Sequence, residues 1–251
     1  MLNSLKNKCR QSARARLLWA TFRYPLISIL GYIYGAYLTL RYVNEYKKFP
    51  AIIFQTGLLR LHIRKGKRSK FCVEDRLIVQ PLGGTRIPCL IQLGEDAKIV
   101  IRGEFVIGDD VRIAASRSAS IGIGGKNKES GSGISGGCLV NAYKKIVIGA
   151  DVIIAWDTFI TDSDWHPIEG SSHQKDTIIG NHVWIAVGAK ILKGAVIGDD
   201  SIVGCSAVVL AGHYPAKVLL VGVPAKIVKS SMPKWNRDLH EQVEPISVGQ
   251  R

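Results

Sequence analysis

The sequence has little of what marks several common protein classes. Its five cysteines, Cys9, Cys72, Cys89, Cys138 and Cys205, are scattered, odd in number and include no CxxC pair. Small secreted scaffolds need paired cysteines and zinc ribbons need closely spaced ones, so both classes are excluded. The pattern indicates a protein whose thiols are reduced, as in the cytosol.

Acidic residues are almost absent from the first 70 positions, where Glu45 stands alone against 15 lysines and arginines. The rest of the chain carries 19 residues of each sign, so the whole net charge of +14 belongs to this N-terminal region. Because residues 71–251 carry no net charge, this part of the chain is not expected to present a nucleic-acid-binding surface. No nucleic-acid partner is expected.

What the sequence contains instead is an aliphatic residue at every sixth position. The series is Ile179, Ile185, Ile191, Ile197, Val203 and Val209. An amphipathic helix repeats its apolar residues every three or four positions and a half-buried strand every two, so neither explains the spacing. Hexapeptide repeats predict a β-helix, in which three hexads make one triangular coil with the aliphatic residues pointing inward. Each coil buries its apolar row against the next.

The same register occurs earlier, with interruptions. Its further members are Ile107, Ile113, Ala119, Ile148, Ile154 and Ile160. Two segments break it, Gly122–Gly137 and Thr161–Thr177. The first is rich in glycine, serine and charge, and we expect a protruding loop. Loops that leave a repeat are natural places for function, so the second, which contains TDSDWHPIEG, is a candidate site.

The N-terminal region contains one long uncharged segment, Tyr24–Leu40. A spanning helix needs about 20 apolar residues and at least roughly 17, so a crossing is marginal. Basic residues lie on both sides, and because they prefer the cytoplasmic face, one crossing would misplace a cluster. We expect a helical segment attached to the membrane surface through residues 1–70. The alternative is a pair of helices packed on the end of the coil or on another subunit.

Four stretches carry a family resemblance: the hexad series, TDSDWHPIEG, GNHVWIAVGAKI and the closing VGVPAKIVK. Over Gly108–Lys229 the chain resembles the hexapeptide-repeat acyltransferases, in the branch of maltose, galactoside and polysaccharide O-acetyltransferases. The resemblance implies an all-β fold, a left-handed parallel β-helix. It also implies acetyl-CoA as donor with no metal, a sugar or glycolipid hydroxyl as acceptor, and a homotrimer with active sites between subunits.

The catalytic assignments follow from this resemblance. His166 matches the catalytic histidine, and an imidazole suits removal of the acceptor proton because its pKa lies near the working pH. Asp164 is the favoured carboxylate to orient it, with Asp162 and Glu169 as alternatives. Asn141 and Asp162 are expected to bind the acceptor, since an amide both donates and accepts.

The expected cofactor contacts also follow from the resemblance. Trp184 matches the tryptophan beside the pantetheine arm, and the Val187 N–H matches the donor to the thioester oxyanion. Cys205 matches a small residue of the cofactor channel and is expected to be a buried, inert thiol. Lys226 and Lys229 match the basic pair near the coenzyme phosphates. The chain departs from the family after its last full hexad, where Leu-Ala replaces the common Thr-Lys.

We therefore expect three regions: residues 1–70, helical and membrane-associated; residues 71–229, the β-helix; and residues 230–251, a tail. In the tail, Trp235 and Leu239 are expected to cap an end of the coil.

The preferred function is O-acetylation of a lipid-linked sugar in surface-polysaccharide biosynthesis (capsule, O-antigen or exopolysaccharide), in the cytoplasm at the inner face of the membrane. N-acetylation of an amino sugar or small xenobiotic is an alternative. Two other classes stay open: a non-catalytic scaffold, and a zinc hydratase resembling gamma-type carbonic anhydrase. The candidate zinc ligands are His166, His173, His182 and His213.

Overall fold

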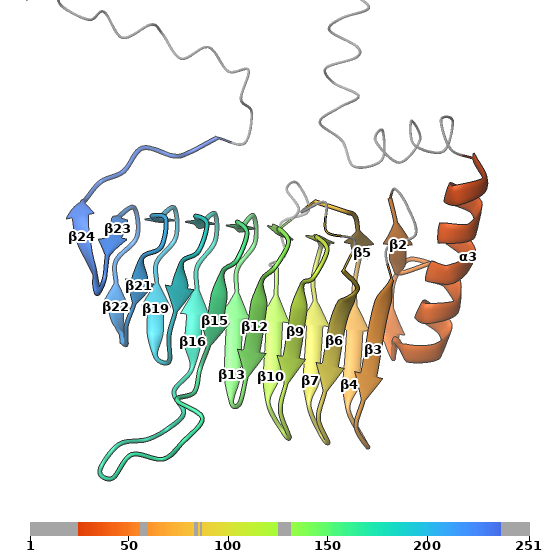
Figure 1. Cartoon of the computed structure of the whole chain (residues 1–251), viewed down its shortest axis with the longest axis horizontal. Helices are drawn as coiled ribbons and strands as arrows, with labels where there is room; N and C mark the ends of the chain where they lie inside the picture. The colour runs from red at the N-terminus through yellow and green to blue at the C-terminus, as the bar shows by residue number, and fades with distance from the viewer. Residues whose placement is uncertain (1–24, 56–59, 83–84, 86, 125–131, 237–251) are drawn as a thin grey trace, which may run out of the picture.

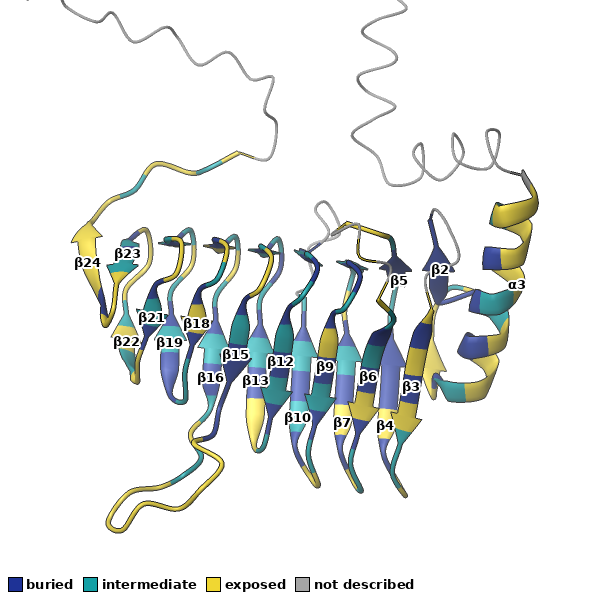
Figure 2. Cartoon of the chain, viewed as in Figure 1, coloured by how far each residue is buried: buried dark blue, intermediate teal, exposed yellow. Residues whose placement is uncertain are grey.

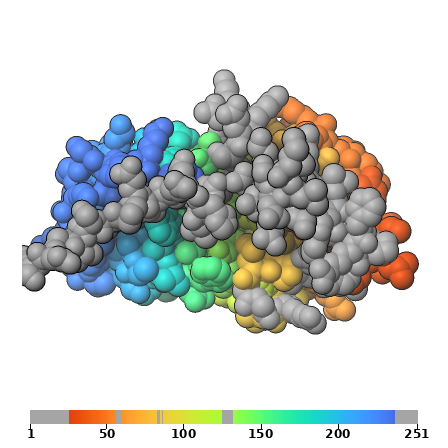
Figure 3. Space-filling model, turned by 90° about the horizontal axis from the view of Figure 1, so that it is seen from above, coloured from red at the N-terminus to blue at the C-terminus, as the bar shows by residue number. Residues whose placement is uncertain are grey.

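The computed structural model describes residues 25–55, 60–82, 85, 87–124 and 132–236. These residues form a left-handed parallel β-helix with the helix α3 (Pro25–Tyr42) lying across its first coil (Figure 1). Seen from above, the body is elongated, with α3 at one end and the last strands at the other (Figure 3). The predicted β-helix with an N-terminal helical segment is confirmed, and attachment of that segment to a membrane stays a prediction.

Three sheets form the faces of the prism, and each sheet takes every third strand from β1 to β23, while β24 is added to sheet B. Sheet A contains β1 (Glu45–Tyr46), β4 (Lys70–Val73), β7 (Lys98–Ile101), β10 (Ser120–Ile123), β13 (Lys145–Ile148), β16 (Thr177–Ile179), β19 (Ala195–Ile197) and β22 (Gly212–Tyr214). Sheet B contains β2 (Ile52–Phe54), β5 (Arg76–Val79), β8 (Glu104–Ile107), β11 (Ser132–Ile134), β14 (Ile153–Ile154), β17 (Trp184–Ile185), β20 (Ile202–Val203), β23 (Leu219–Gly222) and β24 (Ala225–Lys229). Sheet C contains β3 (Leu61–Lys65), β6 (Cys89–Leu93), β9 (Arg112–Ala115), β12 (Leu139–Ala142), β15 (Phe159–Thr161), β18 (Lys190–Ile191) and β21 (Val208–Val209).

The six-residue series forms the core. All twelve aliphatic positions of the register are at most 1% exposed, which confirms their inward orientation. Each apolar row stacks on the equivalent row of the neighbouring coil, for example Ile154 on Ile185 and Ile185 on Val203 in sheet B. The buried residues therefore form one continuous column along the coil axis (Figure 2).

Glycine after the aliphatic residue lets successive coils approach closely. A Cβ added at Gly149 would lie 2.4 Å from the carbonyl oxygen of Gly180 in the next coil. Strands in adjacent coils are separated by only about 4.8 Å, so this position has no room for a side chain.

A regular coil consists of three hexads, as the pairing of Trp184 with Ile202 shows. The preceding coil is longer, because Ile153 pairs with Trp184, well beyond the position that three hexads would reach. The additional residues form an excursion between β15 and β16, at the corner where sheet C passes into sheet A (Figure 1). The predicted interruption at Thr161–Thr177 is confirmed. The other one is shorter than predicted, because β11 resumes the coil at Ser132; residues 125–131 lie outside the described residues.

The coil also begins earlier than expected. Strands start at Glu45 rather than near residue 71, and the described residues between Glu45 and Val73 contain β1 to β4 and no helix. These coils are not evident in the sequence, because the buried residues that begin their strands, such as Ile52 of β2 and Leu61 of β3, do not lie six positions apart. Residues 1–24 lie outside the described part of the chain.

The α3 helix packs on the first coil through two glycines and a threonine. Gly35 has no space for a side chain, since an added Cβ would lie 2.2 Å from the Ile52 carbonyl oxygen. The buried Thr39 hydroxyl donates to the Gly35 carbonyl and accepts from the Ala51 and Ile52 amides. Among the described residues, no helix has the length and apolar character of a membrane span.

The opposite end of the coil is closed by β24, which folds back antiparallel on β23. Trp235 does not cap this end as expected. Its indole instead lies on the flank of the coil, stacked on His182 with ring centroids 4.1 Å apart, and its Nε1 donates to the His182 carbonyl at 2.9 Å. Leu239 lies outside the described residues.

Candidate active site

The excursion is an antiparallel hairpin, residues 162–176, anchored at its base. Ser163 and Gln174 form an isolated antiparallel bridge near the coil, and Ile168 and Ser171 form a second one near the tip. The Ser171 amide closes the tip by donating to the Ile168 carbonyl at 3.0 Å. The hairpin therefore projects a short, ordered arm from the corner between sheets C and A.

His166 lies on the outgoing arm of this hairpin. Its side chain is exposed, and its ring has no hydrogen-bond partner among the residues that the structure describes. The preceding Trp165 packs edge-on against Tyr143 of the previous coil, with ring centroids 4.9 Å apart and planes at 65°. The Trp165 amide also donates to the Ser163 hydroxyl at 3.0 Å. These contacts fix the backbone next to the histidine and leave its imidazole open to a substrate.

Asp162, predicted to bind the acceptor, is a structural residue here. Its side chain is fully buried, and its two oxygens accept hydrogen bonds from the amides of Tyr143, Lys144 and Lys145. A carboxylate that satisfies three backbone donors holds the previous corner in place. It presents no exposed atom to an acceptor or to His166.

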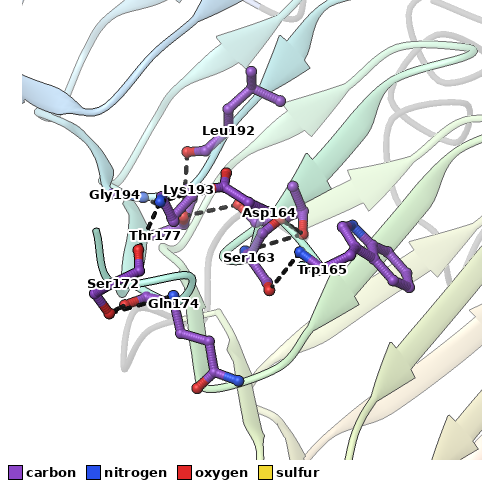
Figure 4. Close-up of polar contacts among 10 residues, drawn as sticks. Ser163, Asp164, Trp165, Ser172, Gln174, Thr177, Leu192, Lys193 and Gly194 are labelled. Carbon is purple, nitrogen blue, oxygen red and sulfur yellow. Dashed lines mark hydrogen bonds and ion pairs between the residues drawn. The ribbon is translucent and has the colours of Figure 1, made fainter. Parts of the chain in front are cut away.

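Asp164, the predicted partner of the His166 ring, is bound elsewhere. Lys193 donates from its ammonium group to Asp164 Oδ2 and, at 2.7 Å, to the carbonyl of Ser172 on the returning arm (Figure 4). The Lys193 side chain is only 15% exposed. One lysine of the next coil thus holds both arms of the hairpin, a role that sequence reasoning missed. The available signal was its position at the next C–A corner, one turn of the coil after the hairpin.

Asn141 lies on β12, beside the base of the hairpin. It pairs in register with Thr161, the last residue of β15 before the chain leaves the coil. Its side chain is partly exposed on the outer face of sheet C. The structure therefore brings Asn141 and the hairpin of His166 to the same edge of the prism.

A second set of predicted residues forms a column at the corner between sheets B and C. Val187 and Cys205 are one coil apart there, as the hydrogen bond from the Ser206 amide to the Val187 carbonyl shows. The Val187 N–H has no acceptor among the described residues. A fixed donor of this kind can stabilise an oxyanion. Trp156, 46% exposed, occupies the equivalent corner of the preceding coil.

Cys205 differs from expectation, because its thiol is exposed rather than buried. It occupies the turn of its hexad, next to Ser206 with φ of 55°, where side chains point away from the core. The exposed position suits a channel residue but does not make the thiol inert by burial.

The two predicted lysines lie on β24 but at different ends of it. Lys226 pairs with Val221 near the end of β23, on the side of the B–C corner. Lys229 pairs with Leu219 at the start of β23, across the width of sheet B. Both side chains are exposed. Only Lys226 extends the column formed by Val187 and Cys205.

Trp184 stands apart from this column, on the outer face of sheet B. It is 41% exposed, and Trp235 of the C-terminal segment lies beside it with ring centroids 6.2 Å apart. His182, which stacks on Trp235, is held by Asp200 at 2.9 Å from its Nδ1. Sequence reasoning missed this aromatic group, because Trp235 is far from Trp184 in the sequence and outside the repeat.

Within one chain, the two groups of residues occupy different corners. The hairpin of His166 leaves the corner between sheets C and A, whereas Val187 and Cys205 lie between sheets B and C. They are separated by the width of sheet C, in which a four-residue strand such as β12 spans roughly 13 Å. A general base must come within about 3 Å of the proton that it removes. One chain therefore does not bring His166 and the Val187 amide to the same reacting group.

No group of three potential metal ligands occurs among the residues that the structure describes. A hollow of about 320 Å³ lies on sheet A, near Glu45, Cys72 and Lys98. It is three strands away from β16 within that sheet, and so does not belong to the hairpin.

Comparison with known proteins finds sequence similarity to bacterial transferases. The model of the bacterial transferase hexapeptide (six repeats) matches residues 176–211. The chain is 29% identical over 166 residues to the putative lipopolysaccharide biosynthesis O-acetyl transferase WbbJ of Escherichia coli K12, covering 55% of this chain and 80% of that protein. The matched repeat and the name of this relative agree with the resemblance to the hexapeptide-repeat acyltransferases. The resemblance seen in the sequence is thereby confirmed.

Two further proteins are similar to parts of the chain. The chain is 38% identical over 102 residues to the polysialic acid O-acetyltransferase of Neisseria meningitidis, covering 38% of this chain and 47% of that protein. The chain thus spans less than half of this second relative. The crystal structure of the polySia specific acetyltransferase NeuO superposes with a TM-score of 0.47 and 22% identity, covering 77% of this chain and 92% of that one.

Proposed function

We propose that this protein transfers the acetyl group of acetyl-CoA to a sugar hydroxyl in the biosynthesis of a surface polysaccharide. The observation that carries the proposal is the exposed imidazole of His166 on an anchored hairpin of a hexapeptide-repeat coil. Two relatives, one named for lipopolysaccharide biosynthesis and one for polysialic acid, support a glycan acceptor. Because acetyl-CoA is made in the cytoplasm, the reaction takes place there.

His166 acts as the general base in this proposal. Its imidazole takes the proton of the acceptor hydroxyl as the oxygen attacks the thioester carbon. The thioester oxygen becomes an oxyanion that accepts a hydrogen bond from the Val187 N–H. Collapse of the tetrahedral intermediate breaks the C–S bond, and the departing thiolate takes the proton from the imidazolium. The products are the acetyl ester and free coenzyme A.

Two protomers form each site in this account. His166 and Val187 must meet at one thioester, yet they lie at different corners of a single chain. In a closed threefold assembly, the C–A corner of one protomer lies against the B–C corner of the next. A homotrimer meets this requirement and supplies three equivalent sites.

The acceptor binds beside the hairpin, over Trp165 and Tyr143. Trp165 is 42% exposed and is held edge-on to Tyr143, so an aromatic surface stands next to His166. The apolar C–H face of a sugar ring packs on such a surface, while its hydroxyls need polar partners. The Asn141 amide, at the base of the hairpin, supplies one donor and one acceptor.

The test is acetyl transfer by the purified full chain, followed by thiol release from acetyl-CoA and by mass spectrometry of the polysaccharide. His166→Ala lowers the rate by about 10²- to 10⁴-fold, because the hydroxyl loses its base. His213→Ala is the matched control, since His213 is an exposed histidine on β22, outside both corners of the site. Unchanged transfer in the His166 variant, or no transfer to any glycan by the wild-type chain, contradicts the proposal.

A further inference from the structure

The α3 helix has one face that contacts nothing else in the described chain. Six large apolar residues on this face are 51–76% exposed: Leu26, Ile29, Leu30, Ile33, Tyr37 and Leu40. At 100° per residue they fall within a sector of about 100°, so they form a single stripe. Figure 2 shows this exposed stripe on the side of α3 turned away from the coil. We call it the α3 outer face.

The other side of α3 is fixed to the coil, which sets the direction of the outer face. Gly31 and Gly35 bring the helix backbone against Phe54 and Ile52, and Thr39 bonds the backbone of the following strand. The helix lies across the first coil, so its outer face forms the end of the molecule (Figure 1). A helix that is apolar on all sides is normally covered on all sides. Here only half of it is covered.

Basic residues flank the α3 outer face on one side. Arg41 is exposed in the last turn of the helix, and the exposed Arg60 lies near the helix residue Tyr34, whose hydroxyl donates to the Leu61 carbonyl of β3. Arg64 is exposed further along β3. Glu45 is the only acidic residue in the first 70 positions of the sequence. The sequence that precedes the helix, positions 1–24, includes lysines and arginines and no acidic residue.

We propose that the α3 outer face lies in the interfacial region of an anionic lipid bilayer, with the helix axis parallel to the membrane. The apolar stripe enters the boundary of the acyl chains, and the flanking arginines contact anionic headgroups. A bilayer satisfies both the apolar area and the excess of one sign of charge. A second copy packed face to face would bring two basic rims together, and like charges across an interface oppose binding.

Co-sedimentation of the full chain with vesicles tests this proposal. Vesicles of phosphatidylcholine alone are compared with vesicles that also contain phosphatidylglycerol. The test variant carries Ile29→Gln, Ile33→Gln and Leu40→Gln, all on the outer face and all compatible with a helix. The matched control carries Ile87→Gln, Val223→Gln and Val228→Gln, which remove three exposed aliphatic residues from the coil.

The wild-type chain and the control bind the anionic vesicles, and binding weakens at about 0.5 M NaCl because the headgroup charges are screened. The outer-face variant binds at least about tenfold more weakly, with unchanged thermal unfolding and unchanged thiol release from acetyl-CoA. Equal binding by the outer-face variant and the wild type overturns the proposal. So does a wild-type chain that ignores vesicles but forms an assembly that the outer-face variant dissolves, since the occupant is then a second copy.

Discussion

Lys193 and Asp164 form an ion pair between a coil and the hairpin that the preceding coil extends. The same ammonium group donates to the Ser172 carbonyl on the returning arm of the hairpin. Lys193 therefore connects the two arms, and His166 lies between these two contact points in the sequence. The lysine end of the ion pair is shielded from solvent, since the Lys193 side chain is 15% exposed, whereas the Asp164 side chain is 36% exposed. A pair in this setting holds its geometry better than a surface salt bridge does.

Loss of the Lys193 ammonium group should slow the chemical step. In Lys193→Met the hairpin keeps its backbone bridges but loses the contact that sets its angle to the coil, so His166 moves relative to the thioester. We expect kcat to fall about 10- to 100-fold and the KM for acetyl-CoA to change little. Lys193→Arg should recover most of the rate. A Lys193→Met variant with normal kcat would remove the positioning role.

A double-mutant cycle is the control for this prediction. If the ion pair is the relevant contact, Asp164→Asn adds little to the effect of Lys193→Met. Fully additive effects would mean that Asp164 acts on another group, such as the His166 ring.

Trp165 and Trp156 should affect different substrates. Both are exposed tryptophans of similar accessibility, but Trp165 lies beside His166 and Trp156 lies in the column of Val187. Trp165→Ala should raise the KM for the glycan roughly 3- to 10-fold and leave the KM for acetyl-CoA unchanged. Trp156→Ala should raise the KM for acetyl-CoA instead. Initial-rate kinetics with each substrate varied in turn would contradict this assignment if both variants changed the same constant.

Asp162 should contribute to stability rather than to acceptor binding. Asp162→Ala leaves the amides of Tyr143, Lys144 and Lys145 without an acceptor, which should cost about 3 kcal/mol or more in the free energy of unfolding. Glu169→Ala, at the exposed tip of the hairpin, should change stability by less than about 0.5 kcal/mol. Denaturant titration measures both values. A stable Asp162→Ala protein that had lost only its affinity for the acceptor would restore the binding role.

Three of the four described thiols should resist modification. Burial raises the pKa of Cys89 and of Cys138 to about 11, and burial followed by the charge of Glu45 raises the pKa of Cys72. These thiols are protonated at pH 8 and are inaccessible as well, whereas Cys205 is exposed. In a Cys9→Ser background, a disulfide reagent at pH 8 should therefore titrate one thiol rapidly. Two or more rapid equivalents would contradict the packing of the coil.

The same shifts set a sign for the pH dependence of stability. An unfolded cysteine titrates near its ordinary pKa, taken here as 9.0, while the folded Cys89 and Cys138 keep their protons up to about pH 11. The unfolded state thus loses protons first, and the free energy of unfolding should fall as pH rises from about 9 to 11. Alanine at both positions should flatten this decline.

The six-residue register was enough to predict the coil, because inward-pointing side chains stack directly on their equivalents in each neighbouring coil. Ile185 and Val203, for example, are pairing partners in neighbouring coils. The first coils were missed because packing under α3, through Gly35 and Thr39, supports strands that lack the register. That support comes from residues that are distant from the repeat series in the sequence.

The site was predicted less completely than the fold. The sequence pointed to His166 through its hairpin, but it assigned free roles to Asp162 and Asp164, which the structure shows bound to backbone amides and to Lys193. A short carboxylate in a loop can cap a corner, form an ion pair or bind a substrate, and spacing does not distinguish these. Only the register of neighbouring coils shows which partner is within reach.

Complementation between two inactive variants tests the central claim most directly. His166→Ala removes the base at the C–A corner, and Cys205→Trp fills the column of Val187 and Cys205 at the B–C corner. Each variant alone should be nearly inactive. When the two chains are coexpressed in equal amounts, random assembly pairs an intact hairpin with an intact column at about one quarter of the interfaces, so about a quarter of the wild-type rate should return. Mixed assemblies that recover no activity would show that the reaction is completed within one chain and would contradict a site shared between protomers.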